Sequence, residues 1–247
     1  VTSMSSEQFD YVVVGAGSAG CAVANGLSES GRHSVLLLEA GPESRRNPFV
    51  NTPLGFLQLM FSRRFNWQFN TEPQRHMYDR ALFQPRGKMV GGSSGMNAQV
   101  YIRGHASDYD EWARLGCNGW SYSEVLPYFR RSEHFEPKLA SADVAFHGQG
   151  GPLNVAERRY TNPLSVVFLD AAIQAGYQRN ADFNGSEQEG VGFYYAYQKN
   201  GVRCSNARAY LEPAAGRSNL TVRSDAQVTR VLLSLIHISE PTRRDQI

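Results

Sequence analysis

The sequence predicts an α/β fold built on a doubly wound parallel sheet, and three features near its start carry that prediction. An apolar, β-branched run at 12–14 is typical of a buried strand and stops at Gly15. The pattern G-x-G-x-x-G, from Gly15 to Gly20, then opens an alanine-rich segment that indicates a helix. A second apolar run at 35–38 ends on Glu39 and predicts the next parallel strand.

Each residue of this half-unit has a mechanical role in binding a dinucleotide. Gly15 allows a tight turn, Gly17 lets the backbone approach a pyrophosphate, and Gly20 lets helix and strand pack closely. The helix N-terminus offers unpaired N–H groups and a positive dipole end to phosphates. Glu39 is placed to accept hydrogen bonds from ribose hydroxyls, which argues against a 2′-phosphate and so against NADP. The half-unit alone does not separate NAD from FAD.

The composition excludes several other classes of protein. The chain has 247 residues, 41% of them hydrophobic, a net charge of +2, and arginine pairs that are scattered rather than striped, which disfavours nucleic-acid binding. No apolar stretch reaches the roughly 18 residues of a membrane span, and the N-terminus lacks the pattern of a secretory signal. Three widely spaced cysteines speak against a disulfide framework and a structural metal site, and they favour a cytoplasmic location.

Between residues 45 and 84 the chain shows few regular signals. Residues 45–84 are predicted to form a long wrapping loop. Two capping patterns then predict helices: Ser107-x-x-Asp110, with Gly116 ending the helix, and Ser121-x-x-Glu124. We expect Pro127 to kink the second helix or to delay its start.

The following region predicts short strands around one helix. Asn162 and Pro163 begin a helix with an apolar stripe that Gly176 closes. Strands are expected at 151–155, 193–197, 220–222 and 228–233, and Asn200-Gly201 marks a turn.

A second glycine-rich stretch, at 86–110, reads RGKMVGGSSGMNAQVYIRGHASDYD. Its residues 91–94 give a flexible, hydroxyl-rich backbone able to lie flat against a ligand, and Asn97 adds an amide that donates and accepts. Because this stretch is distant in sequence from the first motif, we expect it to hold the far end of one long cofactor. Residues 87–110 match the first signature of the glucose–methanol–choline (GMC) oxidoreductases, a family of flavoenzymes that the chain resembles from residue 9 to about 232.

The resemblance implies an FAD cofactor and a set of contacts to it. It places the first glycine motif at the pyrophosphate, Glu39 at the ribose, Met89 and 97–100 along the flavin, and Val228 at the adenine. A histidine binds flavin covalently in some members, where this chain has Met96, so we expect non-covalent FAD. The full set of implied cofactor-binding residues is Gly15, Gly17, Ser18, Ala19, Gly20, Glu39, Ala40, Trp67, Arg86, Met89, Gly91, Gly92, Ser94, Asn97, Ala98, Gln99, Val100 and Val228.

The resemblance also implies a function and a domain division. The resemblance is strongest to the branch of the family that oxidises choline or aliphatic alcohols by hydride transfer to flavin. It does not indicate whether the electron acceptor is a quinone or oxygen. The FAD-binding domain is expected at 1–150 and 205–232, and part of an α+β substrate-binding domain at 151–204. The alternative is a stand-alone FAD-binding module. The resemblance leaves peripheral attachment to the inner membrane open.

No catalytic residue is assigned, because the family's histidine base lies in a C-terminal region that this chain lacks. Each histidine present is expected to be a surface or loop residue: His33, His76, His105, His134, His147 and His237. From 233 onward the chain departs from the family pattern, and LSLIHISEPTR resembles a translated sequencing adapter. We therefore expect 233–247 to be a non-native tail, and an isolated chain that is poorly soluble and inactive.

Overall fold

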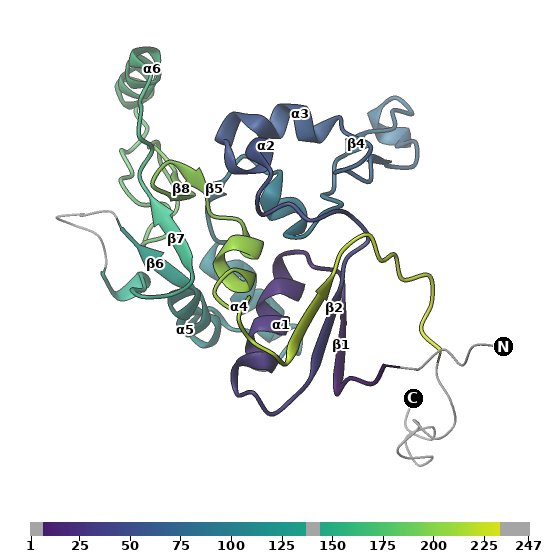
Figure 1. Cartoon of the computed structure of the whole chain (residues 1–247). Helices are drawn as coiled ribbons and strands as arrows, with labels where there is room; N and C mark the ends of the chain where they lie inside the picture. Colours follow the sequence, from purple (N-terminus) through teal and green to yellow (C-terminus); the bar gives the residue numbers. More distant parts are fainter. Residues whose placement is uncertain (1–6, 137–143, 233–247) are drawn as a thin grey trace.

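The fold is α/β and contains a parallel sheet, as the sequence predicts. The computed structural model describes residues 7–136 and 144–232, so the predicted tail lies outside the described residues. Strands β1 (Tyr11–Val14), β2 (Val35–Leu38) and β10 (Leu220–Arg223) run parallel with β2 in the middle (Figure 1). Leu36 pairs with Val12 on one side and Thr221 on the other.

Helix α1 (Ser18–Glu29) covers one face of this sheet. Its buried Cys21 and Ala24 pack with Val35 and Leu37 of β2, and a short π-helical turn, η5 (Ala207–Leu211), completes the cluster. On the opposite face, Val12 and Val14 remain 54% and 57% exposed. Within the described part of the chain, β1 is thus covered on one side, and neither the second helical layer of a doubly wound sheet nor a β-meander is seen.

The predicted wrapping loop at 45–84 contains more regular structure than expected. It holds α2 (Pro48–Asn51), the 3₁₀ turn η1 (Pro53–Gly55), α3 (Phe56–Met60), the hairpin β3 (Phe69–Asn70) with β4 (Phe83–Gln84), and the turn η2 (Arg75–Met77). These elements are too short to give a periodic sequence signal. Their apolar residues nevertheless reach a small core, where Val50 and Leu59 pack against Met89 and Met96.

A second, mixed sheet has strand order β5-β8-β7-β6, with β9 paired to β8. Its strands are β5 (Val100–Tyr101), β6 (Glu133–Phe135), β7 (Leu153–Ala156), β8 (Tyr195–Lys199) and β9 (Val202–Arg203). Asn200 and Gly201 form the predicted turn between β8 and β9, and both have positive φ. Because β5 and β6 precede residue 150 in sequence, the predicted domain boundary cuts through this sheet, and the division stays a prediction.

Two helices lie between β5 and β6 in the chain, and only the second has the predicted N-cap. Helix α5 (Tyr122–Ser132) starts at the capping box of Ser121 and Glu124 and runs through Pro127 without the expected delay. Helix α4 (Ala106–Arg114) is capped by the His105 side chain with Asp108, so the prediction of Ser107 and Asp110 was wrong by two residues. The short turns η3 (Gly92–Gly95) and η4 (Val144–Phe146) complete this region.

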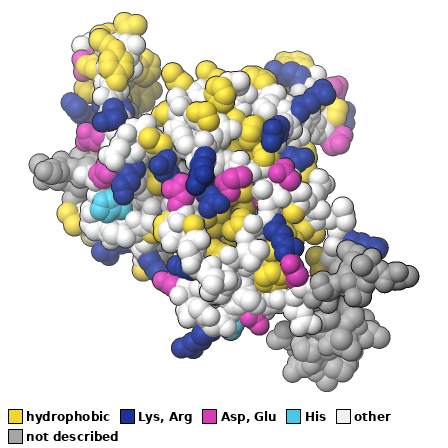
Figure 2. Space-filling view, in the orientation of Figure 1, with side chains coloured by type: hydrophobic (Ala, Val, Ile, Leu, Met, Phe, Trp, Pro, Cys, Tyr) yellow, Lys and Arg dark blue, Asp and Glu magenta, His cyan; other side chains and the backbone are white. Residues whose placement is uncertain are grey.

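Helix α6 (Pro163–Gln174) starts at Asn162 as predicted and projects from the rest of the molecule (Figure 1). Its apolar stripe packs poorly: Leu164 and Phe168 are 75% and 76% exposed, whereas Leu169 is buried. Figure 2 shows hydrophobic side chains gathered on this projection. The apolar periodicity identified the helix correctly, but within the described residues most of the stripe is not covered.

The strand predicted at 228–233 is absent from its described part, 228–232. The chain instead leaves β10 and continues along the end of β2, where Asp225 N donates to Gly41 O and Ala226 N to Glu39 O, both at 2.8 Å. The valine-rich segment at 228–232 therefore predicted a strand that does not form in the described residues. Within 7–136 and 144–232, no helix has both the length and the apolar character needed to cross a membrane.

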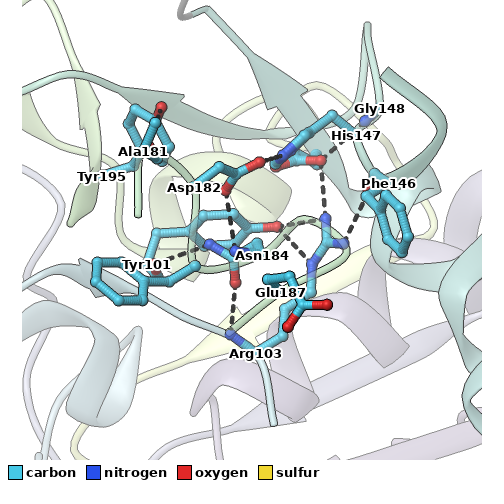
Figure 3. A network of polar contacts seen from close by, with 12 residues as sticks. Tyr101, Arg103, Phe146, His147, Gly148, Ala181, Asp182, Asn184, Glu187 and Tyr195 are labelled. Atoms are coloured by element: carbon cyan, nitrogen blue, oxygen red, sulfur yellow. Dashed lines mark hydrogen bonds and ion pairs between the residues drawn. The ribbon is translucent and has the colours of Figure 1, made fainter. Parts of the chain in front are cut away.

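A buried polar network joins the mixed sheet to its flanking loops (Figure 3). Arg103 Nη2 contacts Glu133 Oε2 at 3.0 Å. The His147 ring lies between Glu133 Oε1, 3.0 Å from Nδ1, and Asp182 Oδ2, 2.6 Å from Nε2. His147 lies in a loop, which agrees with the expectation of a surface or loop residue, but only 4% of its side chain is exposed. Opposite charges and full hydrogen bonding offset the cost of burying these groups.

Candidate dinucleotide site

A cavity of about 300 Å³ lies at the carboxyl ends of β1 and β2, where parallel sheets bind ligands. Segments that are distant in sequence meet there. The lining residues are Val14, Gly15, Gly17, Leu38, Glu39, Ala40, Trp67, Gly87, Gly92, Ala226, Gln227 and Val228. Gly15, Gly17, Glu39, Ala40, Trp67, Gly92 and Val228 were all expected from the sequence to contact a cofactor.

The first glycine motif has the geometry that a dinucleotide turn needs. Gly15 has φ of +93°, a left-handed conformation that favours glycine, and its N–H donates to Leu38 O at 2.7 Å. A Cβ built on Gly17 meets no atom within 4 Å, so open space lies above this backbone. A Cβ on Gly20 would lie 1.9 Å from Gly15 O, so only glycine lets α1 approach the turn this closely.

The N-terminus of α1 is available to an anion. Gly17 is its N-cap residue and makes no side-chain cap, and the first turn contains no acidic residue. Ser18 and Ala19, which were predicted cofactor contacts, are exposed there. The unpaired N–H groups and the positive end of the helix dipole therefore face solvent rather than a carboxylate of the chain.

Glu39 connects the turn to the end of β2. It is 5% exposed, and its two carboxylate oxygens accept from Ala16 N and Gly41 N, both at 2.9 Å. Burial raises the pKa of Glu39 and outweighs these hydrogen bonds, which lower it along with the nearby charge of Lys88. A carboxylate has about four lone-pair sites, so Glu39 can brace the turn and still accept from a ligand hydroxyl in the cavity.

The two glycine segments are in direct contact. Gly91 N donates to Ala16 O at 2.6 Å, and a Cβ on Gly92 would lie 2.8 Å from Gly17 Cα. The two segments therefore meet at Gly91 and Gly92, and the part of the cofactor that the second segment holds stays a prediction. Two glycine backbones approach closely because neither carries a side chain, and sequence separation does not reveal that contact.

Other predicted site residues lie outside this cavity. Met89 is fully buried in the small core beside Met96, and Arg86 is exposed with its guanidinium on Pro85 O. Ser94 donates to Gly91 O at 2.6 Å and accepts from Asn206 N. Asn97, Ala98 and Val100 are exposed beyond η3. The structure therefore groups part of the predicted set in one cavity and leaves the run 94–100 outside it.

Gln99 is buried, unlike its exposed neighbours in the run 97–100. It is 2% exposed, and its φ of +65° is unusual for a residue with a side chain. Its Oε1 accepts from Gln198 Nε2 at 2.9 Å, but its own Nε2 has no partner among the described residues. A buried donor without a partner is costly and indicates that a group is missing from the site.

Lys88 was not selected as a site residue, although it belongs to the second glycine segment. Its Nζ lies 4.7 Å from the centre of the Trp67 ring, and its charge acts on Glu39. The Trp67 ring also stacks on Phe69, with centroids 5.7 Å apart. An open glycine turn, a free helix end and a buried carboxylate in one cavity, with the Lys88 ammonium over the Trp67 ring that lines it, fit an anionic nucleotide.

Comparison with known proteins identifies the family. The model of the family described as GMC oxidoreductase matches residues 9–245. The chain belongs to the GMC oxidoreductases. Among curated members it is 46% identical to "Alcohol dehydrogenase [acceptor]" of Pseudomonas putida and 45% identical to "Oxygen-dependent choline dehydrogenase" of Photobacterium profundum, over 91% of its length in both cases.

Solved structures of GMC relatives support the same fold. Pyridoxine 4-oxidase from Mesorbium loti aligns with a TM-score of 0.84 and 34% identity, over 92% of this chain and 44% of that one. An FAD-dependent oxidoreductase from Chaetomium thermophilum aligns with a TM-score of 0.83 and 28% identity, covering 92% and 40%. The chain spans only 40% and 39% of the lengths of the Pseudomonas and Photobacterium relatives.

Proposed function

We propose that this chain binds FAD non-covalently and is the N-terminal part of an oxidoreductase that oxidises a primary alcohol, choline or an aliphatic alcohol, to the aldehyde. The observation that carries the proposal is the 300 Å³ cavity, in which both glycine segments, Glu39 and Val228 converge. The names of the matching relatives, choline dehydrogenase and alcohol dehydrogenase, support the alcohol as substrate class.

Different residues of the site bind different parts of the cofactor. The exposed N–H groups of α1, together with Gly15 and Gly17, bind the pyrophosphate. Glu39 accepts from the adenosine ribose, and the backbone at Val228 contacts the adenine. Trp67 and the run from Ser94 to Val100 lie toward the flavin.

Non-covalent binding follows from the side chain at position 96. Met96 is 6% exposed and packs with Val50, Leu59 and Met89 in the small core. A thioether held there offers no nucleophile to the flavin. The FAD is therefore retained by hydrogen bonds and packing alone, and it is released when the protein unfolds.

When bound, FAD accepts a hydride from the alcohol carbon. A base must take the hydroxyl proton, and no described residue is assigned that role. Among the described histidines, His147 is held between two carboxylates, and His33, His76, His105 and His134 lie outside the cavity. The chain contributes binding and orientation of the cofactor, so we expect it to bind FAD without oxidising alcohols.

An FAD titration of the purified chain tests the proposal. We expect quenching of flavin fluorescence to saturate at one FAD per chain, with no comparable binding of NAD. Acid precipitation should leave the yellow colour in the supernatant. Glu39→Ala should weaken binding by about tenfold, since two backbone N–H groups lose their acceptor. Glu43→Ala is the matched control, because Glu43 pairs with Arg45 and does not line the cavity.

Three results would contradict the proposal. A chain that is folded by circular dichroism but binds no FAD refutes the cofactor site. Colour that stays in the acid pellet refutes non-covalent binding. Dye-linked oxidation of choline or an aliphatic alcohol by the purified chain refutes the assignment of the base to a region outside it.

A further inference from the structure

Arg203, in β9, is the largest fully buried side chain of the described residues, with 1% exposed. Its guanidinium donates only to neutral acceptors. Nε reaches Val50 O at 2.9 Å, and Nη1 reaches Asn97 O at 2.6 Å and Asn97 Oδ1 at 3.0 Å. Longer contacts join Nη1 to Ser94 O at 3.4 Å and Nη2 to Pro53 O at 3.5 Å.

The charge of Arg203 has no counter-ion among residues 7–136 and 144–232. The similarly buried Arg103 differs, because it pairs with Glu133 at 3.0 Å. Burial lowers the pKa of Arg203 to about 10, so the guanidinium stays protonated at neutral pH. Burying an ion without an opposite charge is costly even when the ion is hydrogen-bonded. A positive charge in this position therefore calls for a specific role.

The acceptors of Arg203 belong to two segments that are distant from β9 in sequence. Val50 and Pro53 lie in α2 and η1, whereas Ser94 and Asn97 lie in the run assigned to the flavin side. Asn97 Oδ1 also accepts from Gln99 N at 3.1 Å, across the left-handed backbone of Gln99. Arg203 thus fixes the run from 94 to 97 at its carbonyl groups.

The same hairpin holds this run a second time. Gln198 of β8 is the register partner of Arg203 and donates to Gln99 Oε1 at 2.9 Å. The Nε2 atom of this Gln99 side-chain amide has no hydrogen-bond partner among the described residues. The β8–β9 hairpin therefore holds both ends of 97–99, because Arg203 donates to Asn97 O and Tyr197 N donates to Gln99 O at 3.0 Å.

We propose that Arg203 is a positioning residue that holds Ser94–Gln99 for the flavin and presents an uncompensated positive charge to the bound cofactor. This inference rests on the proposed FAD site. FAD is anionic through its pyrophosphate, and reduction adds electrons to the flavin. A fixed cation nearby, in a medium of low dielectric, favours the reduced cofactor and raises its midpoint potential.

The test compares three variants of the chain reconstituted with FAD. Arg203→Met removes the charge and keeps an apolar stem, and Arg203→Lys keeps the charge but cannot bridge Val50 and Asn97. Arg159→Met is the control, because Arg159 is exposed and donates to Asn200 O on the same hairpin. FAD dissociation constants come from fluorescence titration, and midpoint potentials from equilibration with reference dyes.

The proposal predicts a different result for each variant. Arg203→Met should weaken FAD binding by roughly tenfold or more, because several buried carbonyl groups lose their donor, and should lower the midpoint potential. Arg203→Lys should also bind FAD more weakly but keep the wild-type potential. Arg159→Met should match the wild type in both measurements.

Each contrary result has a distinct meaning. If the wild-type chain binds no FAD, the proposed function fails. If the wild type binds FAD and Arg203→Met matches Arg159→Met, only the role of Arg203 is overturned. If Arg203→Met loses its near-ultraviolet circular dichroism, it has not kept the native packing, and the test then rests on Arg203→Lys. A lowered potential, or an unchanged FAD affinity, in that variant overturns the inference.

Discussion

Replacing Gly20 by alanine tests whether the first glycine motif depends on close backbone packing. The added Cβ lies 1.9 Å from the Gly15 carbonyl oxygen, where real Cβ atoms essentially never come within 3.0 Å. The obstacle is backbone, so it cannot rotate away as a side chain does. Either α1 or the turn at Gly15 must move by about an ångström, which shifts the N–H groups that face the cavity.

The magnitude follows from two opposed effects. Overpacking of this kind costs about 1–3 kcal/mol, and the upper end applies because the contact is with backbone. Alanine recovers about 1 kcal/mol through its higher helix propensity. We therefore expect Gly20→Ala to lower the free energy of unfolding by about 2 kcal/mol and to weaken FAD binding.

Gly26 supplies a control in the same helix. It is exposed, and a Cβ built there meets nothing within 4 Å, so alanine should stabilise the protein by about 1 kcal/mol. The same chemical change thus has opposite expected signs at two positions of α1. Thermal unfolding followed by circular dichroism should separate the two variants by roughly 10 °C. If Gly20→Ala melts at the wild-type temperature or above, the packing argument is refuted.

Three further predictions follow from other sites. Gly92→Ala places a Cβ 2.8 Å from Gly17 Cα at a φ of +53°, so FAD affinity in a fluorescence titration should fall by about tenfold; unchanged affinity would count against the contact. Burial alone lowers the pKa of His147, but hydrogen bonds to Asp182 and Glu133 outweigh it and raise the pKa above 6.5. The stability that this raised pKa contributes is fully present below pH 6.5 and is lost as the pH rises through the folded-state pKa. The midpoint of thermal unfolding should therefore fall as the pH rises from 6.5 through that pKa. His147→Asn should remove this dependence of the midpoint on pH. Phe168→Glu, on the exposed face of α6, should reduce light scattering by the concentrated chain without changing FAD affinity, whereas equal scattering would show that α6 does not drive association.

Local features of the fold were predictable from the sequence because their signals lie within a few residues. The β1–α1–β2 unit needs only apolar periodicity and three glycines, and Ser121 and Asn162 cap helices through bonds to nearby backbone. The cap of α4 was missed because histidine is an uncommon N-cap residue, whereas Ser107 fits the usual pattern two positions later.

Features that depend on distant residues were not predictable. His147 has no periodic context, and its partners Glu133 and Asp182 are 14 and 35 residues away. Residues 228–232 include three β-branched residues, which favour a strand, but no neighbouring strand pairs with them in the described structure. For the site, the sequence identified most residues of the cavity but not their arrangement, since the contact of Gly17 with Gly92 arises only in three dimensions.

That contact limits how far the nucleotide-binding half-unit is modular. A peptide containing only β1, α1 and β2 would keep the turn and the free helix end, but it would lack the wall that Gly87 and Gly92 supply and the cover from Ala226 to Val228. Affinity for the nucleotide is thus a property of the assembled tertiary structure, and grafting the glycine motif alone into another scaffold should transfer little of it.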